Sequence, residues 1–373
     1  MLALLLTLSV AVQDSGAFVV RIGSDTLSLE QYKRTATQMR GEYVIRAPRS
    51  LHRIYIHDLN PDGTIRRSEL ITHNIGGGPG PMETKLSVEF VGDTAIVVSP
   101  RGDSTVTQKV AVPRGTYPYT LHVYGLLEHI ARQARAAGKD SVAFTALASS
   151  DRTSGGYVKK LGGDTLRLMF SDGQLAGLGP FTFRLDPQGR LVWLTGKGST
   201  VQVEVQRVAS VPMAQAGPMF ANRPLGQLSP RDTTRGTIGG SEVWIDYSRP
   251  SRRGRDIFGA LEPWNKVWRT GANAATQLST PVDLVIGGAT VPAGKYTLWT
   301  LPSPTGWKLI INKQTGQWGA GPTAYDPAQD LVRVDAKVET LATPVDVFTI
   351  AIEPAAITFA WDRTRYSVPV SKK

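Results

Sequence analysis

The chain contains no cysteine, and this absence excludes several kinds of chemistry at once. Without thiols there are no disulfides, thiolate metal sites, iron–sulfur clusters or cysteine nucleophiles. Charged residues are also scarce, at 20% of 373 residues, whereas typical soluble domains have about 25%. Hydrophobic residues make up 41%, which is enough to form real cores and excludes a globally disordered chain.

Hydrophobic runs long enough to cross a bilayer are missing as well, because a spanning helix needs about 20 apolar residues. The one candidate, residues 1–11, is shorter and is typical of a secretory signal peptide, with small Ser9 and Ala11 placed for cleavage after Ala11. No basic region precedes it, so we expect a signal truncated at its start; the alternative is a buried first strand. We therefore predict an exported protein, periplasmic or extracellular, with no integral membrane segment in the mature chain.

Basic residues outnumber acidic ones by 42 to 31, which gives a net charge of +11. They are scattered through the expected strands, with no basic helix and no aromatic-interleaved RNA-binding motif, so we expect no nucleic-acid partner. Anionic surfaces of the bacterial envelope are the expected neighbours instead. The glycine-rich segment 76–81 lacks the Lys-Ser/Thr of a phosphate loop. We expect no cofactor, and the sequence carries no signal for an oligomeric state.

Glycine and proline are abundant, with 38 and 24 residues, and this excess of turn formers favours many short strands over a helical bundle. Residues 209–228 are rich in Pro, Gly and Ala and show no periodicity, which predicts a linker. All five histidines precede this segment, whereas seven of the eight tryptophans follow it. We therefore predict two domains, residues 17–208 and residues 229–373.

The first domain has the pattern of successive hairpins, with turn sequences such as 60–63 between short alternating strands. Apolar residues recurring at a spacing of three to four predict one helix over residues 119–137, which Gly138 would stop. We predict a curved antiparallel sheet, or half-barrel, wrapped on this helix. At the level of fold it is similar to the half-barrel of periplasmic lipoprotein carriers. The second domain alternates throughout, which predicts a β-sandwich or jelly roll, so the chain is mainly β.

Histidine is missing from the second domain, as cysteine is from the whole chain. This excludes Ser-His-Asp or Cys-His nucleophiles there and typical zinc or copper sites. The histidines of the first domain are badly spaced for chelation, so we predict no metal. A glycosidase-like pair of carboxylates stays open; the alternative is that these acids are turn caps and ion pairs. The candidates are Asp246, Asp256, Glu262, Asp326 and Asp330.

Two neighbouring motifs supply the candidate binding residues. Arg249, Arg252, Arg253 and Arg255 surround a proline and a glycine just after an expected strand, and their guanidinium forks suit carboxylate, sulfate or phosphate groups. The second motif follows at residues 263–276, where aromatic faces and polar groups could contact a ligand. Its candidate residues are Trp268, Arg269, Asn273 and Thr276. The alternatives are a solvated or internally paired basic loop and a buried tryptophan pair.

The segment from Ser229 to about Val370 resembles the bacterial Domain of Unknown Function 2911. The resemblance is carried by several motifs in order: Tyr247–Pro250, Gly254–Gly259, Val267–Asn273, Ala275–Thr276, Pro292–Tyr296, Asn312–Lys313, Gln317–Gly319, Tyr325–Asp326 and Asp330. Family members often carry an acid where this chain has Ala274, so a catalytic role of that acid would be lost here. The resemblance implies an exported or envelope-associated protein with no established activity.

We weigh four hypotheses from these observations. The first is a non-catalytic exported protein whose second domain binds an anionic or glycan ligand of the envelope. Its candidate residues are Arg249, Arg252, Arg255, Trp268, Arg269, Asn273, Thr276 and Trp318. The second is a carboxylate-dependent enzyme acting on a glycan. The third is a purely structural envelope protein, in which the tryptophans and arginines hold the fold together. The fourth is a lipid or lipoprotein carrier, which needs an apolar cavity between the curved sheet and its helix.

Overall fold

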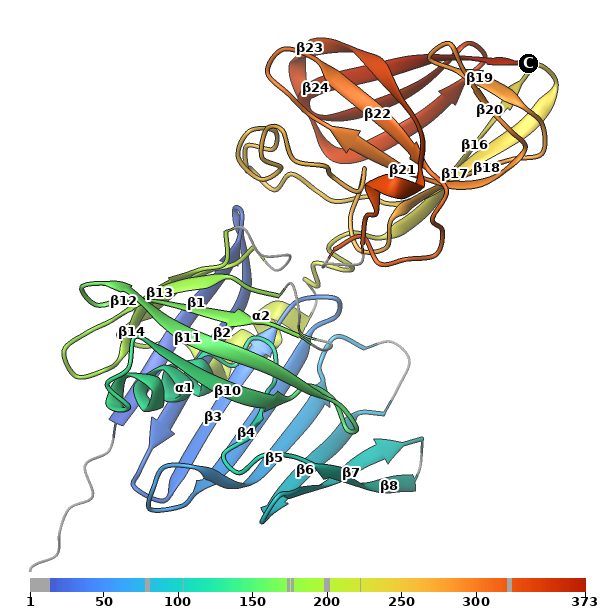
Figure 1. The fold of residues 1–373 in the computed structure, drawn as a ribbon. Helices are drawn as coiled ribbons and strands as arrows, with labels where there is room; N and C mark the ends of the chain where they lie inside the picture. The colour runs from blue at the N-terminus through green and yellow to red at the C-terminus, as the bar shows by residue number, and fades with distance from the viewer. Residues whose placement is uncertain are drawn as a thin grey trace, which may run out of the picture. The chain divides into compact units, whose positions relative to one another are not determined.

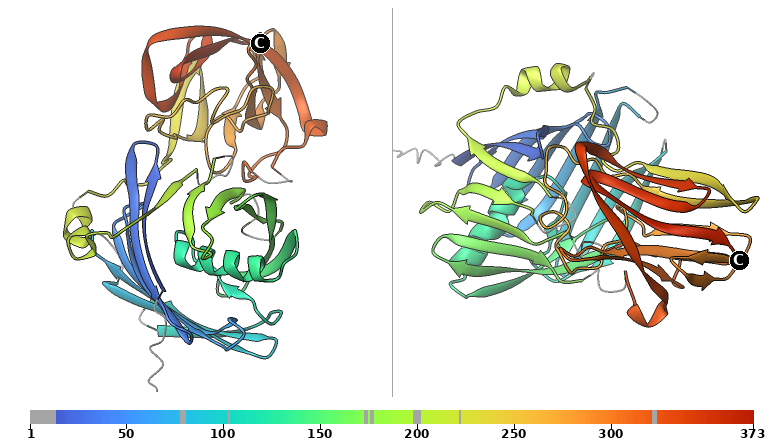
Figure 2. Two further views of the ribbon diagram at one scale, coloured as in Figure 1. Left: turned by 90° about the vertical axis from the view of Figure 1, so that its left-hand side faces the viewer. Right: turned by 90° about the horizontal axis from the view of Figure 1, so that it is seen from above.

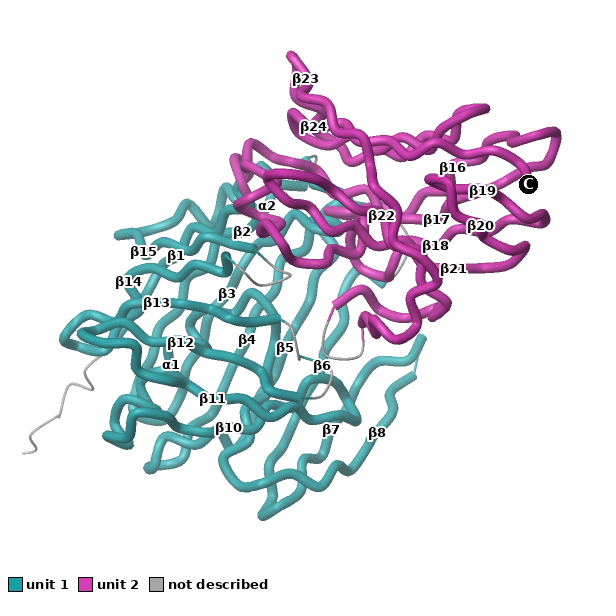
Figure 3. Tube along the Cα trace, turned by 45° about the horizontal axis from the view of Figure 1, so that its top comes forward, with its two compact units in different colours: residues 1–22, 26–226 teal, residues 23–25, 227–373 magenta. Residues whose placement is uncertain are grey.

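The computed structural model describes residues 14–77, 81–102, 104–172, 175, 178–197, 202–221, 223–320 and 324–373. The predicted signal peptide, residues 1–11, lies outside the described residues. The chain divides into two compact units, which we call the first and the second unit; the first comprises residues 1–22 and 26–226, and the second residues 23–25 and 227–373 (Figure 3). No helix within the described ranges is long and apolar enough to cross a membrane.

The described residues of the first unit form one 15-stranded sheet in the order β8-β7-β6-β5-β4-β3-β2-β1-β15-β14-β13-β12-β11-β10-β9 (Figure 1). Neighbouring strands are antiparallel except β9 and β10. Pairing of β1 with β15 joins the two halves of the sheet. The strands are β1 (Asp14–Ile22), β2 (Asp25–Arg34), β3 (Gln38–Ile45), β4 (Leu51–Leu59), β5 (Ile65–Asn74), β6 (Glu83–Val91), β7 (Thr94–Arg101), β8 (Ser104–Ala111), β9 (Tyr117–Pro118), β10 (Ser141–Leu147), β11 (Thr153–Gly162), β12 (Thr165–Phe170), β13 (Phe181–Leu185), β14 (Leu191–Thr195) and β15 (Glu204–Val208).

Helix α1 (Tyr124–Ala136) lies between the two halves of the curved sheet (Figure 2). It is shorter than the predicted helix 119–137, because Tyr117–Pro118 form β9 and pair with β10. His122 then adopts a φ of 70°, a conformation outside the right-handed helix, and the helix starts after Val123. The prediction of one helix within a curved antiparallel sheet is confirmed, with its start corrected by five residues.

The segment 209–228, predicted to be a linker because it shows no periodicity, contains helix α2 (Met213–Ala221). Met213, Ala216 and Phe220 of this helix are buried against Ala17 and Leu29 of the sheet. Figure 2 shows α2 on the outer side of the curved sheet, opposite α1. The apolar periodicity of α2 is short and weak, so it does not predict a helix by itself. Packing of its apolar side chains against the sheet stabilises the helix.

The described residues of the second unit form a nine-stranded sheet in the order β16-β17-β18-β21-β22-β23-β24-β19-β20. Its elements are β16 (Arg231–Ile238), β17 (Ser241–Ser248), β18 (Thr276–Thr280), β19 (Leu284–Ile286), β20 (Ala289–Val291), β21 (Gly294–Leu301), β22 (Trp307–Asn312), the 3-10 helix η2 (Pro327–Gln329), β23 (Asp330–Glu353) and β24 (Ala356–Lys372). The long β23–β24 hairpin folds over β16 and β17: Tyr247 lies against Phe348, and Gly236 against Ile352, where a Cβ would come within 2.6 Å. A buried aromatic and aliphatic core fills the space between these layers. The predicted mainly β fold class is confirmed.

Candidate functional site

Residues 249–275 connect β17 to β18, two antiparallel neighbours that a hairpin of about 2–5 residues could join. Six of the eight candidate binding residues lie in this loop, and a seventh, Thr276, directly follows it. The loop is fixed to the sheet by a pair of hydrogen bonds of 2.8 Å in which the main chains of Trp268 and Thr300 each donate to the other. A connection of this length that is ordered by specific contacts is a good place for a functional site.

Two of the candidate residues are part of the core. Trp268 is 3% exposed, stacks on Trp361 at 5.7 Å between ring centroids, and donates its indole N–H to the carbonyl of Gly271 over 3.0 Å. Thr276 is fully buried, and its hydroxyl donates to the carbonyl of Thr270 over 2.7 Å. These side chains hold the loop in place and are not open to a ligand.

Two of the arginines brace the loop against neighbouring strands. Arg249 pairs with Asp232 at 3.1 Å and also donates to the hydroxyl of Thr349 over 3.1 Å. Arg252 pairs with Asp362 at 2.7 Å. Because these guanidinium groups are already neutralised by carboxylates of the fold, they are poorly placed to take an external anion.

Three other candidates lie together. Arg269 donates from Nη1 to the carbonyl of Gly319 over 3.0 Å, and the Gly319 amide donates to the carbonyl of Asn273 over 2.9 Å. Ala274 forms an isolated β-bridge with Trp318. A Cβ on Gly319 would come within 2.3 Å of the Arg269 side chain, so only glycine fits there. Asn273 is exposed, and Trp318 is 58% exposed.

Arg269 differs from the bracing arginines in its partners. Within the described part of the chain it forms no ion pair shorter than 4.0 Å, and its Nε is buried without a hydrogen-bond partner. Burial lowers the pKa of this guanidinium, and the negative charge of Glu262 opposes that shift. A guanidinium that has donors left over and is hydrogen-bonded to the residue after an exposed tryptophan can bind an anionic group.

Sequence reasoning named Glu262 only as one of five acids that could form a carboxylate pair. Burial raises its pKa to about 7, against the opposing charges of Arg269 and Arg255. Among the described residues it has no ion-pair partner within 4.0 Å. The apolar residues around it in the chain, Ile257, Phe258 and Leu261, were the available signal that this carboxyl would be desolvated.

Arg255 completes this group of charges. Its Nε donates to the carbonyl of Arg252 over 2.9 Å and its Nη2 to that of Ser251 over 2.7 Å. Burial and the nearby Arg253 lower its pKa, whereas Asp346 and Glu262 oppose the change. Arg255, Glu262 and Arg269 therefore form a group of interacting charges, which carries two positive charges when Glu262 is protonated and one when it is ionised.

The other four carboxylates considered for catalysis have separate structural partners. Asp246 pairs with Arg231 at 2.7 Å, Asp326 caps η2 by accepting from the Ala328 amide over 2.9 Å, and Asp330 accepts from the Tyr325 hydroxyl over 2.8 Å. Asp256 is 88% exposed. In the described ranges no group of three or more His, Asp or Glu side chains is placed to hold a metal ion. This arrangement matches the expectation of turn caps and ion pairs better than that of a catalytic pair.

Comparisons with known proteins agree with the resemblance predicted for the second domain. Residues 229–370 match the model of the family described as a protein of unknown function (DUF2911), and this range contains the whole candidate site. No curated protein matches the chain. Among solved structures, it is similar to a beta-barrel-like protein of domain of unknown function DUF1849 from Brucella abortus, at 10% identity and a TM-score of 0.35. That match covers 52% of this chain and 94% of the other chain.

Proposed function

We propose that the second unit binds an acidic glycan of the bacterial envelope, without transforming it, at the site formed by Arg255, Glu262, Arg269, Asn273 and Trp318. The observation that carries the proposal is Arg269, which forms no ion pair within 4.0 Å among the described residues and whose one side-chain hydrogen bond there goes to a main-chain carbonyl. A partly buried charge held in this way costs stability, and a ligand that supplies a negative charge would offset that cost. The envelope as the source of the glycan rests on the signal peptide predicted for residues 1–11.

The neighbours of Arg269 support a sugar rather than a simple anion. An indole face such as that of Trp318 gives a flat apolar surface for a sugar ring, and a guanidinium fork binds a carboxylate or sulfate on that ring through two parallel hydrogen bonds. The exposed Asn273 amide supplies donors and an acceptor for hydroxyl groups. An acidic sugar satisfies all three side chains, whereas a neutral sugar leaves the guanidinium unused.

The test uses a trimer of galacturonic acid as the acidic probe and maltotriose as the neutral one, with binding to the full-length protein measured by calorimetry. We expect the acidic trimer to bind and Arg269→Gln to weaken it by at least about tenfold, because a charge-assisted hydrogen bond contributes about 1.5–3 kcal/mol. Trp318→Ala should weaken binding as well. Arg235→Ala is the matched control, since Arg235 is an exposed arginine of the same unit that pairs with Glu242.

Four results would contradict the proposal. Equal binding of the acidic and neutral trimers would show that the Arg269 guanidinium does not recognise the acidic group. Unchanged binding in Arg269→Gln would place the ligand elsewhere. Absence of binding, together with a large loss of thermal stability in Arg269→Gln, would favour the purely structural hypothesis. Shortened products of the acidic trimer after incubation with the protein would instead favour an enzyme.

A further inference from the structure

The first unit has an open cavity of about 440 Å³ at the end of the sheet where the β2–β3 and β4–β5 turns lie, at the lower end of this unit in Figure 1. Its wall is formed by the end of β2, the start of β1, the β4–β5 turn and the C-terminal half of α1. This volume falls within the range of about 300–1,000 Å³ that is usual for small-molecule sites.

Two guanidinium groups face this cavity, and they differ in their hydrogen-bond and ion-pair partners. Arg132, on α1, is fully engaged: it forms ion pairs with Asp14 and with Glu128, the latter at 2.6 Å, and donates to the carbonyl of Gly189 over 2.9 Å. Arg34, the last residue of β2, is half-buried. In the part of the chain that the structure describes, Arg34 makes neither a side-chain hydrogen bond nor an ion pair within 4.0 Å.

The Arg34 guanidinium therefore keeps its donors free for solvent or a ligand, at a position where its charge is partly desolvated. Burial lowers the pKa of its guanidinium, and the positive charge of Arg132 lowers it further. Tyr32, Asp14 and Glu128 act in the opposite direction from a distance, but none of them donates to it or accepts from it. A partly desolvated cation near a second cation is stabilised when an anionic group from outside binds to it.

The lining of the cavity narrows the class of ligand. Its charged residues are Arg34, Arg132 and Asp14, and because Arg132 is already paired with Asp14 and Glu128, Arg34 supplies the single positive charge of the lining that has no partner. A group with one negative charge neutralises this site, whereas a dianionic phosphate would leave an excess of negative charge next to Asp14. The remaining wall includes Ala36, Leu59 and Pro61, which offer apolar surface to the body of the ligand.

We propose that this cavity binds a small monocarboxylate, with the carboxylate held by the fork of Arg34 and the apolar part of the ligand lying against Ala36, Leu59 and Pro61. Arg132 contributes a second positive charge but remains tied to Asp14 and Glu128. The site belongs to the first unit and does not depend on the glycan site of the second.

The experiment measures binding of benzoate to the full-length protein by calorimetry, with benzamide as the neutral compound of the same shape. We expect saturable binding of benzoate, at least tenfold weaker binding of benzamide, and weaker binding of acetate, which has no apolar body. Inorganic phosphate should also bind more weakly than benzoate. Arg34→Gln should reduce the affinity for benzoate at least tenfold, and Arg34→Lys should restore it in part, since the charge returns without the fork.

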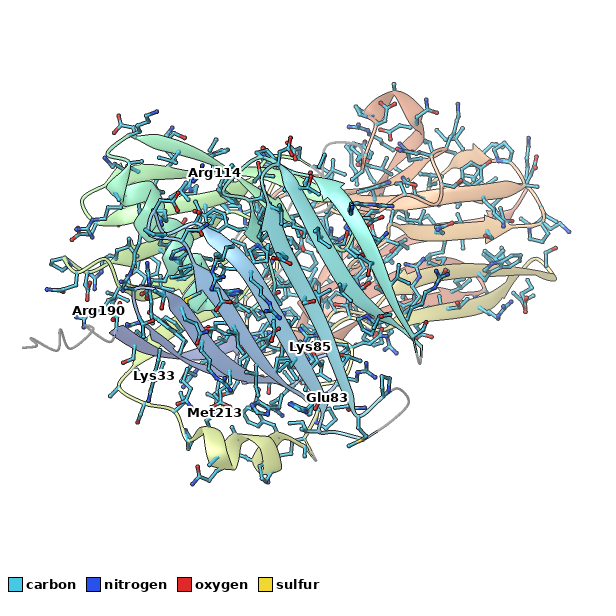
Figure 4. All side chains as sticks on the ribbon, turned by 90° about the horizontal axis from the view of Figure 1, so that it is seen from below. Lys33, Glu83, Lys85, Arg114, Arg190 and Met213 are labelled. Atoms are coloured by element: carbon cyan, nitrogen blue, oxygen red, sulfur yellow. The ribbon has the colours of Figure 1, made fainter. Side chains whose placement is uncertain are left out.

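Lys33→Gln provides the matched control. Lys33 precedes Arg34 on β2 and is exposed (Figure 4). Because side chains alternate between the faces of a strand, its loss should leave benzoate binding unchanged. Arg269→Gln should also leave it unchanged, which separates this site from the proposed glycan site. Arg34→Gln should melt at the same temperature as the unmodified protein or above it, because no contact is lost and a repulsion is removed.

The proposal is overturned if benzoate does not bind saturably, if benzamide binds as well as benzoate, or if Arg34→Gln binds benzoate normally. Tighter binding of inorganic phosphate than of benzoate would reject the assignment to a carboxylate. A marked drop in the melting temperature of Arg34→Gln would show that Arg34 has a structural role after all.

Discussion

Arg249, Arg252 and Arg269 lie in the same loop of the second unit, yet their guanidinium groups meet different partners. The first two reach Asp232 and Asp362, and these carboxylates make them part of the fold. Among the described residues, the Arg269 side chain donates only to the main-chain carbonyl of Gly319. An arginine thus stabilises the fold at positions 249 and 252, whereas at position 269 its guanidinium can still bind an anion. The difference is whether a neighbouring strand supplies a carboxylate as partner.

Glu262 should give the second unit a pH-dependent stability. This carboxyl ionises near pH 4.5 in the unfolded chain and near 7 in the fold. Its contribution to stability is therefore fully present below pH 4.5 and is lost as the pH rises through about 7. We expect Glu262→Gln, which stays uncharged, to melt near the wild-type temperature at pH 5 and above it at pH 8.

Thermal denaturation at the two pH values measures this effect, and Asp256→Asn, at an exposed acid of the same loop, is the control. A constant difference between Glu262→Gln and the wild type across the range would contradict the burial of this carboxyl. In the wild type, protonation of Glu262 also removes a negative charge beside Arg269, so binding of the acidic trimer should strengthen as the pH falls below about 7.

At the scale of elements, helix α1 depends on a residue of a distant strand. Its N-cap, Val123, offers no side-chain hydrogen bond. Glu30 of β2 takes that place: its carboxylate accepts from the amides of Tyr124 and Gly125 over 2.7 and 2.9 Å, and from the Tyr55 hydroxyl over 2.8 Å. Helix N-termini favour negative charge, yet burial raises the pKa of this acid to about 7.

Glu30→Ala should therefore destabilise the first unit by at least about 2 kcal/mol, since it leaves three buried donors without an acceptor. Urea denaturation followed by circular dichroism measures the change. Glu83→Ala, at an acid of β6 that is 62% exposed, serves as the control and should change little. A wild-type midpoint in Glu30→Ala would mean that α1 is held by its apolar face alone.

At the scale of the whole molecule, each unit has its own sheet and its own buried core. Phe183 is fully buried in the first unit, and Phe359 is fully buried in the second, where it stacks on Tyr366 at 4.5 Å between ring centroids. Seven of the eight tryptophans lie in the second unit. Tryptophan fluorescence therefore reports mainly on the second unit, whereas circular dichroism reports on both.

This distribution allows the two cores to be tested separately. Truncating a buried phenylalanine to alanine costs about 3–5 kcal/mol. We expect Phe359→Ala to shift the fluorescence-monitored transition to lower denaturant and Phe183→Ala to leave that transition in place while shifting part of the circular dichroism signal. Equal shifts of the fluorescence transition in both variants would show that the units unfold as one cooperative body.

The sequence by itself determined the mainly β class, the presence of a helix in the first unit, the family resemblance of residues 229–370, and the absence of thiol and histidine chemistry from the second unit. These features depend on composition or on patterns within a few neighbouring residues, so they can be read from short segments of the sequence. It could not place the start of α1 or reveal α2, because the pairing of β9 with β10 and the covering of Phe220 involve strands elsewhere in the chain.

Only the tertiary structure decided which candidate residues face outward. It buried Trp268 and Thr276, left Trp318 exposed, paired Arg249 and Arg252 with acids, and set Glu262 among apolar groups beside Arg255 and Arg269. It also brought Arg34 and Arg132 to one cavity from a strand and a helix far apart in the chain. The physical reason is common to all: a charge or an indole has the same chemistry everywhere in a sequence, and its free energy depends on which distant groups surround it.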